Sequence, residues 1–201
     1  MQELTLMKII ALTGAKGSGK DTVGDIMQAL STPIDYADWR VPVKRIAFAD
    51  PIKRQIEHIF NLSTSNNDQY DLFKRSVLSY DIAEQETRSV EARHVVREIG
   101  MLMRSYDEKQ FVNYVRAAIT NDPNAIWVIT DLRFDNEYMM LREMGAIITK
   151  IVRPQVDSDG HITERGFGDH MVDKIIMNDG NMEYLETRVE WTMNSISKEW
   201  A

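Results

Sequence analysis

The feature that most constrains the fold is the glycine-rich segment GAKGSGKDT at residues 14–22. The apolar run MKIIALT at 7–13 precedes it and stops at the first glycine, as a buried parallel strand would. Four apolar residues after the segment have the spacing of one helix face: Val23, Ile26, Met27 and Leu30. Backbone amides bind phosphate at glycine-rich turns between a strand and a helix. The segment therefore predicts a phosphate-binding loop.

The residues of this loop have distinct expected roles. Glycines let the backbone turn tightly and approach a ligand, and Lys20 would bring a positive charge to the terminal phosphates of a nucleotide. We expect the phosphates to contact the whole loop: Gly14, Ala15, Lys16, Gly17, Ser18, Gly19, Lys20, Asp21 and Thr22. The alternative is a turn that is rich in glycine by chance. The spacing, the lysine and the flanking elements argue against that alternative.

The end of the loop departs from the usual pattern, in which Ser or Thr follows the Gly-Lys pair and holds a magnesium ion. Asp21 stands at that position, and Thr22 comes one residue later. A carboxylate is a hard oxygen ligand that Mg²⁺ accepts directly or through a water. We therefore interpret Asp21 and Thr22 as metal ligands.

Two more candidates follow the apolar segment AIWVIT at 125–130, which we predict to be a strand. Asp131 stands where phosphate-loop proteins carry an acidic residue that orients magnesium. Arg133 could reach the same cleft, because a guanidinium group suits phosphate oxygens. The alternatives are a capping aspartate and a surface arginine paired with Asp135 or Glu137. The phosphate loop favours the functional interpretation of Asp131.

Strands alternate with helices through most of the chain. Further strands are expected at 43–49, 146–152 and 174–177, with amphipathic helices between the strands and at the C-terminus. This alternation predicts a three-layer α/β domain with a mainly parallel sheet. Ligands in such sheets bind beyond the carboxyl ends of the strands. From 61 to 90 the chain is polar and weakly periodic, and we predict an irregular excursion there.

Two groups of residues are candidates for contact with a second substrate. Asp50 and Lys53 follow the strand predicted at 43–49, although the pattern alone favours a helix cap and an exposed first-turn lysine. Three basic residues lie near one face of a predicted helix: Arg93, Arg97 and Arg104. That face is either solvated or a basic wall for phosphate.

A polar segment at 155–170 carries three glycines, as a lid does. With the preceding Arg153 it predicts a lid at about 153–170. Lid arginines close over transferring phosphates and exclude water. We expect three more lid residues near the substrate: His161, Thr163 and Glu164. The alternative is a disordered polar loop.

Composition narrows the classes of partner and of chemistry. The chain has no cysteine, which excludes a disulfide scaffold, a thiol nucleophile and a cysteine zinc site. Its 31 acidic and 24 basic residues give a formal charge of −7, which argues against a nucleic-acid partner. No apolar run reaches the roughly 18 residues that span a membrane, and no signal peptide is indicated. We expect a cytoplasmic protein with neither a membrane nor a nucleic acid as partner.

Several segments together resemble the deoxynucleoside monophosphate kinases of tailed bacteriophages. They are IIALTGAKGSGKDTVGDIM, IAFADPIK, VITDLRFDNEYMMLREMGAIITKIVRP, HITERG and IIMNDG, starting at residues 9, 46, 128, 161 and 175. The Gly-Lys-Asp ending of the loop is shared with that family and with the related phosphomevalonate kinases. The similarity extends in order over most of the chain and is weakest at 61–90.

The resemblance implies ATP-dependent phosphorylation of a deoxynucleoside 5′-monophosphate to the diphosphate, with Mg²⁺, for phage DNA synthesis in the host cytoplasm. It implies a single P-loop kinase domain over 1–201, with a helical monophosphate-binding region at about 50–120 and the lid. The residues implied in catalysis are Lys20, Asp131, Arg133 and Arg153. Those implied on the monophosphate side include Asp50, Lys53 and Arg133, while Asn178 and Gly180 would lie near the adenine.

Other functions and assemblies stay open at this point. Arg97, Met101 and Phe111 replace residues that are usual in the family, so the accepted base is not defined. A kinase of this fold that acts on hydroxymethylated bases in DNA would need a groove, to which the arginines at 93–104 could contribute. A non-catalytic nucleotide-binding protein would need only the loop. The C-terminal helix or the 61–90 segment could serve a homodimer.

Overall fold

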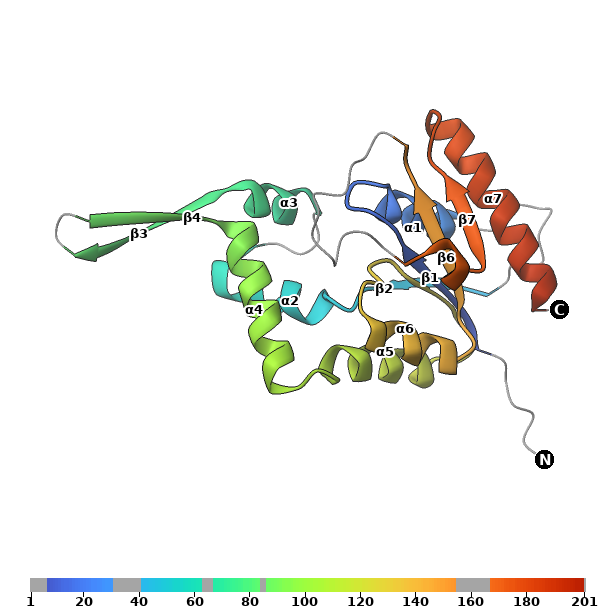
Figure 1. The fold of residues 1–201 in the computed structure, drawn as a ribbon, viewed down its shortest axis with the longest axis horizontal. Helices are drawn as coiled ribbons and strands as arrows, with labels where there is room; N and C mark the ends of the chain where they lie inside the picture. Colours follow the sequence, from blue (N-terminus) through green and yellow to red (C-terminus); the bar gives the residue numbers. More distant parts are fainter. Residues whose placement is uncertain (1–6, 31–40, 63–66, 84–85, 155–166, 201) are drawn as a thin grey trace. The chain divides into compact units, whose positions relative to one another are not determined.

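The computed structural model describes residues 7–30, 41–62, 67–83, 86–154 and 167–200. The chain divides into two compact units. The first consists of Met1–Phe48 with Val112–Ala201, and the second is Ala49–Phe111. Figure 1 shows the helices and strands of both units in order along the chain. A single kinase domain over 1–201 stays a prediction.

Five parallel strands form the sheet of the first unit. From one edge to the other they are β2 (Val43–Ile46), β5 (Ile126–Ile129), β1 (Lys8–Thr13), β6 (Ile147–Val152) and β7 (Lys174–Met177). In the centre, Ile10 lies opposite Val128 and Ile147. Because every pairing is parallel, all five strands end on the same side of the sheet, which we call its carboxyl edge. The predicted α/β fold with a mainly parallel sheet is confirmed.

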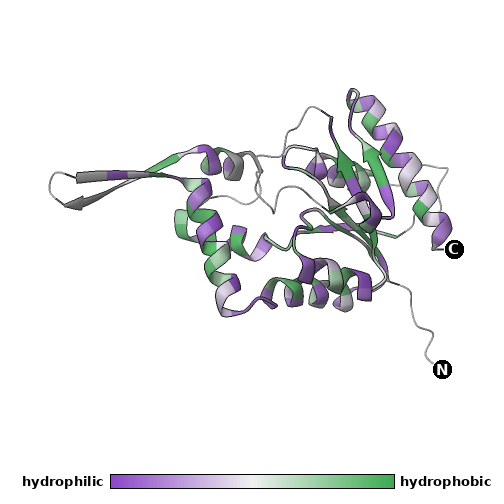
Figure 2. Ribbon diagram, in the orientation of Figure 1, coloured by the Kyte–Doolittle hydropathy of each residue, from purple (hydrophilic) through white to green (hydrophobic). Residues whose placement is uncertain are grey.

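Helices cover both faces of this sheet (Figure 1). On one face lie α1 (Lys20–Ala29) and α7 (Met182–Glu199), and on the other lie α5 (Gln110–Asn121) and α6 (Asp135–Glu143). Figure 2 shows the strands mostly in hydrophobic colours, whereas α7 mixes hydrophilic and hydrophobic residues as an amphipathic helix does. Within the described part of the chain, no helix combines the length and the apolar character needed to cross a membrane.

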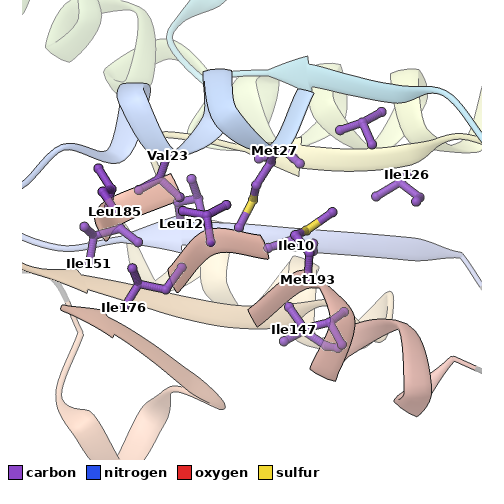
Figure 3. Packing of buried hydrophobic residues seen from close by; sticks show 14 residues of the cluster. Ile10, Leu12, Val23, Met27, Ile126, Ile147, Ile151, Ile176, Leu185 and Met193 are labelled. Carbon is purple, nitrogen blue, oxygen red and sulfur yellow. The ribbon is translucent and has the colours of Figure 1, made fainter. Parts of the chain in front are cut away.

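A buried cluster joins the sheet to α1 and α7 (Figure 3). Ile10 and Leu12 of β1 are completely buried, and Val23 and Met27 of α1 pack against them. The side chains of α7 from Leu185 onward close the cluster from the other helix. Burial of each such side chain contributes about 1.5–3 kcal/mol. This cluster therefore anchors both ends of the phosphate loop, which connects β1 to α1.

The second strand is shorter than predicted. We expected it over 43–49, but β2 ends at Ile46. Two residues later, the Phe48 N–H donates to the Asp131 carboxylate at 2.8 Å. The Phe48 N–H thus bonds to a side chain and not to the backbone of a neighbouring strand. The chain leaves the sheet before residue 50.

The second unit begins with α2 (Asp50–Phe60). Asp50 is the first residue of this helix and Ala49 is its N-cap, so the capping role expected of Asp50 is wrong. Later in the unit, α4 (Ala92–Tyr106) packs on α2 through a glycine. A Cβ atom at Gly100 would lie 2.9 Å from Ile52 Cδ1 of α2. The two helices that carry the residues expected to bind the second substrate are therefore in close contact.

The prediction of an irregular excursion at 61–90 is also wrong. The structure contains α3 (Asn67–Arg75) and an antiparallel hairpin of β3 (Val77–Ala83) and β4 (Glu86–Glu91) there. The hairpin pairs Leu78 with Val90 and Ser79 with Ser89. In β3 (VLSYDIA) the apolar residues Leu78, Tyr80 and Ile82 alternate with polar ones, a strand signal that sequence analysis missed, whereas β4 (ETRSVE) is mostly polar and carries little of that signal.

Candidate functional site

The phosphate loop, residues 14–22, leaves the carboxyl end of β1 in a conformation that requires glycine. Gly14, Gly17 and Gly19 have φ angles of 139°, 76° and 100°, which side-chain-bearing residues rarely adopt. Gly14 is also constrained by contact, because a Cβ atom there would lie 2.3 Å from the Ile151 carbonyl oxygen of β6. The loop is thus pressed against the edge of the sheet.

Lys20, the first residue of α1, folds back on this loop. Its Nζ donates to the carbonyl oxygens of Gly14 at 2.8 Å and Ala15 at 2.7 Å. The side chain is buried, and a buried ammonium group needs such acceptors to offset the loss of water. The lysine therefore holds a positive charge inside the loop, where a phosphate would offer it a charged acceptor.

The first turn of α1 also favours the binding of an anion. Gly19 is its N-cap and has no side chain to accept hydrogen bonds from the first-turn amides. These amides and the helix dipole favour an anion at this end. Two hydroxyl oxygens of this region, Thr13 Oγ1 and Ser18 Oγ, are buried without a hydrogen-bond partner among the described residues. Buried hydroxyl groups are normally satisfied, so the region suits a polar ligand.

Asp21 lies one residue into α1, with a largely exposed side chain. Its Oδ1 is 3.3 Å from Arg45 Nη2 of β2, and Arg45 also contacts the Asp25 carboxylate one turn further along α1. The close approach depends on Gly24, because a Cβ atom there would lie 3.0 Å from Arg45 Nε. Sequence analysis missed Arg45, which with Lys44 makes two of the four residues of β2 charged.

Asp131 and Arg133 follow β5 at the same edge of the sheet. The Asp131 side chain is half-buried, and its Oδ1 accepts the Phe48 N–H at 2.8 Å, which orients the carboxylate. The Arg133 side chain is exposed, while its backbone N–H donates to Glu137 Oε2 at 3.0 Å. The buried Glu137 carboxylate also accepts from Phe134 N at 3.1 Å. Glu137 therefore shapes the turn that presents Arg133.

The ends of β6 and β7 complete this edge. Arg153 follows β6 with an exposed side chain. Asn178 follows β7, and its Nδ2 donates to the Ser18 carbonyl of the phosphate loop at 2.9 Å. Gly180 lies against Tyr184 of α7, because a Cβ atom there would lie 2.6 Å from the Tyr184 ring. Asn178 is thus in direct contact with the loop, and its expected place beside the adenine stays a prediction.

The five candidates on the monophosphate side lie in the second unit, and each has a contact with a neighbour in that unit. Lys53 Nζ is 3.4 Å from Asp50 Oδ1 on α2. On α4, Arg93 Nε lies 3.4 Å from Glu91 Oε2, and Arg97 Nη2 lies 2.9 Å from His94 Nδ1. The Arg104 guanidinium stacks over the Phe111 ring at 4.6 Å. Glu91 therefore partly neutralises Arg93, whereas the contacts with His94 and Phe111 leave the charges of Arg97 and Arg104 in place.

The lid prediction lies mostly outside the described residues, which include neither His161, Thr163 nor Glu164. The chain after it is held to the first unit by aromatic and polar contacts. The Phe167 ring stacks on Tyr138 of α6 at 4.8 Å. A short 3₁₀ turn, η2 (Asp169–Met171), follows, and the Met171 carbonyl accepts from Tyr138 Oη at 3.0 Å.

Arg142 of α6 secures the same segment. It donates to the Met171 carbonyl at 2.9 Å and to Asp173 Oδ2 at 2.6 Å, and its Nε donates to Tyr138 Oη at 3.0 Å. Burial lowers the pKa of Arg142, but the hydrogen bonds to Asp173 and Tyr138 outweigh it and raise the pKa above its ordinary value. Beside it, the hydrogen bond from Lys150 at 2.7 Å lowers the pKa of Asp169.

Comparison with known proteins gives a consistent result. The family described as deoxynucleotide monophosphate kinase matches residues 99–189. The deoxynucleotide monophosphate kinase of Enterobacteria phage T4 is 24% identical over 250 residues, covering 93% of this chain and 99% of that protein. A protein of Acanthamoeba polyphaga mimivirus, named as a putative deoxynucleotide monophosphate kinase, is 29% identical over 168 residues, covering 76% of this chain and 78% of its own length.

Among solved structures, the dephospho-CoA kinase from Campylobacter jejuni superposes with a TM-score of 0.51. The alignment covers 96% of this chain and 98% of that one, at 14% sequence identity. At this identity the likeness shows the fold alone. It agrees with the α/β architecture described above, and the sequence similarities confirm the resemblance that the motifs predicted.

Proposed function

From its similarity to the viral deoxynucleotide monophosphate kinases, we propose that this chain is a phosphotransferase that converts deoxynucleoside 5′-monophosphates to diphosphates with ATP. The observation that carries the proposal is the loop at 14–22. Its three positive-φ glycines and the inward-folded Lys20 form an anion site at the carboxyl edge of the sheet. The T4 enzyme resembles this chain over nearly its whole length. We expect this chain to act in the cytoplasm, which would be the host cytoplasm if a phage encodes the chain.

Lys20 and the loop amides would hold the phosphates of ATP. In the structure Lys20 Nζ donates to two backbone carbonyls. A bound phosphate would replace at least one of these neutral acceptors with a charged one, which makes a stronger hydrogen bond. The lysine then neutralises charge that develops on the phosphates as the terminal group is transferred. No covalent intermediate with the protein is needed.

The donor groups beside the loop fit a magnesium ion. Mg²⁺ in nucleotide sites keeps several waters and takes one or two carboxylates together with substrate phosphates. The exposed Asp21 carboxylate has a long contact of 3.3 Å with Arg45, and Thr22 adds a hydroxyl group beside it. Asp131 offers a second carboxylate, oriented by Phe48. When bound, the ion would supply charge neutralisation on the transferring phosphate.

The remaining candidate residues would bind the acceptor and close the site. Arg133 and Arg153 have exposed side chains at the carboxyl edge and would contact the transferring phosphate. The proposed acceptor residues of the second unit are Asp50, Lys53, Arg93, Arg97 and Arg104. Those of the lid are His161, Thr163 and Glu164. The acceptor phosphate oxygen is already anionic at neutral pH, so the reaction needs no strong general base.

A coupled ATP-to-ADP assay with Mg²⁺ tests this function. The acceptors are ribo- and deoxynucleoside monophosphates, common and hydroxymethylated, with unmodified and hydroxymethylated duplex DNA in parallel. We expect turnover on at least one free deoxynucleotide, abolished in Lys20→Ala and kept in Lys198→Ala, which changes an exposed lysine at the end of α7. Silence on every free monophosphate, with transfer to modified DNA, would overturn the proposed substrate class. Gel filtration of the same preparation measures whether the enzyme is a homodimer.

A further inference from the structure

Asn178 connects two parts of the chain that are 160 residues apart in sequence, the end of β7 and the phosphate loop. A backbone hydrogen bond holds Asn178 to the sheet: its N–H donates to the Val152 carbonyl of β6 at 2.7 Å. This bond continues the parallel pairing of β6 and β7 past Met177. The Asn178 side chain then reaches the loop, where Nδ2 donates to the Ser18 carbonyl oxygen at 2.9 Å. The sheet thus holds a hydrogen-bond donor at a defined point beneath the loop.

The acceptor belongs to a peptide unit that matters for phosphate binding. The Ser18 carbonyl and the Gly19 N–H share one trans peptide plane, in which they point in opposite directions. A hydrogen bond that holds the carbonyl toward Asn178 therefore turns the Gly19 N–H away from Asn178. Gly19 is the N-cap of α1, where backbone N–H groups face an anion. A residue outside the loop thus contacts the peptide unit that carries the Gly19 N–H.

Gly19 is shaped to allow this contact. A Cβ atom at Gly19 would lie 2.5 Å from Asn178 Nδ2, closer than two such atoms can approach. The Asn178 amide therefore occupies the space that any other residue at 19 would fill. Gly19 also has a φ of 100°, so a side chain there would strain the backbone and would displace the Asn178 amide.

We propose that Asn178 is a positioning residue, which orients the Gly19 amide toward the phosphates of the donor nucleotide. The inference rests on the proposed function and goes beyond it, because it assigns Asn178 a role that does not involve the base. Adenine recognition by Asn178 and loop positioning by Asn178 make different predictions for a ligand that has phosphates and no base.

Inorganic tripolyphosphate is such a ligand, and calorimetry measures its binding without turnover. We expect Asn178→Ala to weaken the binding of tripolyphosphate and of ATP by a similar factor of about ten, the worth of one hydrogen bond. Asn178→Leu, which keeps the size of the side chain and lacks the donor, should behave alike. Asn181→Ala is the matched control. Asn181 caps α7 by accepting from Tyr184 N at 2.9 Å, so its loss should lower the unfolding temperature and leave tripolyphosphate affinity unchanged.

Unchanged tripolyphosphate affinity in a folded Asn178 variant would overturn the proposal, and weaker ATP binding alone would assign the residue to the base. Circular dichroism melts of all variants identify any that are unfolded, and the Leu variant then replaces the Ala variant. Failure of the proposed function has a separate signature. Wild-type protein would bind tripolyphosphate through the loop, yet transfer phosphate to none of the acceptors in the coupled assay.

Discussion

Arg45 of β2 bridges two carboxylates of α1, with its Nη2 3.3 Å from Asp21 Oδ1 and its Nη1 in contact with Asp25. Arg45 is largely buried and Asp21 is largely exposed, so the arginine can hold the aspartate at the end of the phosphate loop. The unusual Gly-Lys-Asp ending is therefore part of an ion-pair cluster. Asp25, the other carboxylate on Arg45, provides the control that distinguishes a metal ligand at Asp21 from an ion-pair partner.

We predict that Asp21→Ala lowers activity by weakening the binding of Mg²⁺, and that high Mg²⁺ recovers part of the activity. A hard carboxylate ligand is lost, and excess metal compensates by mass action. The measurement is the rate as a function of free Mg²⁺ at saturating substrates. Asp25→Ala is the matched control, because it removes the other carboxylate on Arg45 one turn away. Equal shifts in both variants, or full activity of Asp21→Ala at limiting Mg²⁺, would show that Asp21 is not a metal ligand.

Gly14→Ala should destabilise the protein more than Gly145→Ala. Both glycines have positive φ, at 139° and 77°, so both substitutions strain the backbone by about 1–3 kcal/mol. Only at Gly14 would the new methyl group also meet backbone, 2.3 Å from the Ile151 carbonyl, whereas the space beside Gly145 is open. Urea unfolding of the two variants measures the difference. A Gly145→Ala loss equal to that of Gly14→Ala would refute the steric argument.

Arg142→Gln should lower the free energy of unfolding by about 2 kcal/mol, because it breaks hydrogen bonds to Tyr138, Met171 and Asp173 together. The control is Arg116→Gln, which breaks an exposed ion pair with Glu143 and should cost about 0–1 kcal/mol. Thermal or urea unfolding of both variants gives the comparison. Similar losses would mean that Arg142 acts only as another surface charge.

The Lys150–Asp169 pair predicts a pH dependence of stability. The pKa of Asp169 is lowered in the folded protein, so the folded state binds this proton less readily than the unfolded state. The resulting stabilisation is present above the ordinary pKa of 3.8 and is lost as the pH falls through the lowered value. Asp169→Asn should therefore flatten the fall in unfolding free energy below about pH 4. A pH profile with an unchanged slope in this range would contradict the assignment.

Local pattern was enough to predict the part of the site that lies in consecutive residues. The apolar run, the glycines and the helix spacing from Val23 to Leu30 predicted β1, the loop and α1, because each element is encoded by its own periodicity. The parallel sheet followed from the alternation of strands and helices. The hairpin at 77–91 escaped prediction although Leu78, Tyr80 and Ile82 of β3 alternate with polar residues, because the mostly polar β4 leaves little trace in periodicity or composition.

The contacts that shape the loop came only from the tertiary structure. Asn178 reaches Ser18 and Arg45 reaches Asp21 because the parallel sheet brings the ends of β7 and β2 to the same edge as the end of β1. Spacing along the chain cannot encode such pairs, since the intervening elements set the distance between them. The sequence by itself thus determined where the glycine-rich loop lies, between β1 and α1. The packing of distant strands decided which side chains contact that loop.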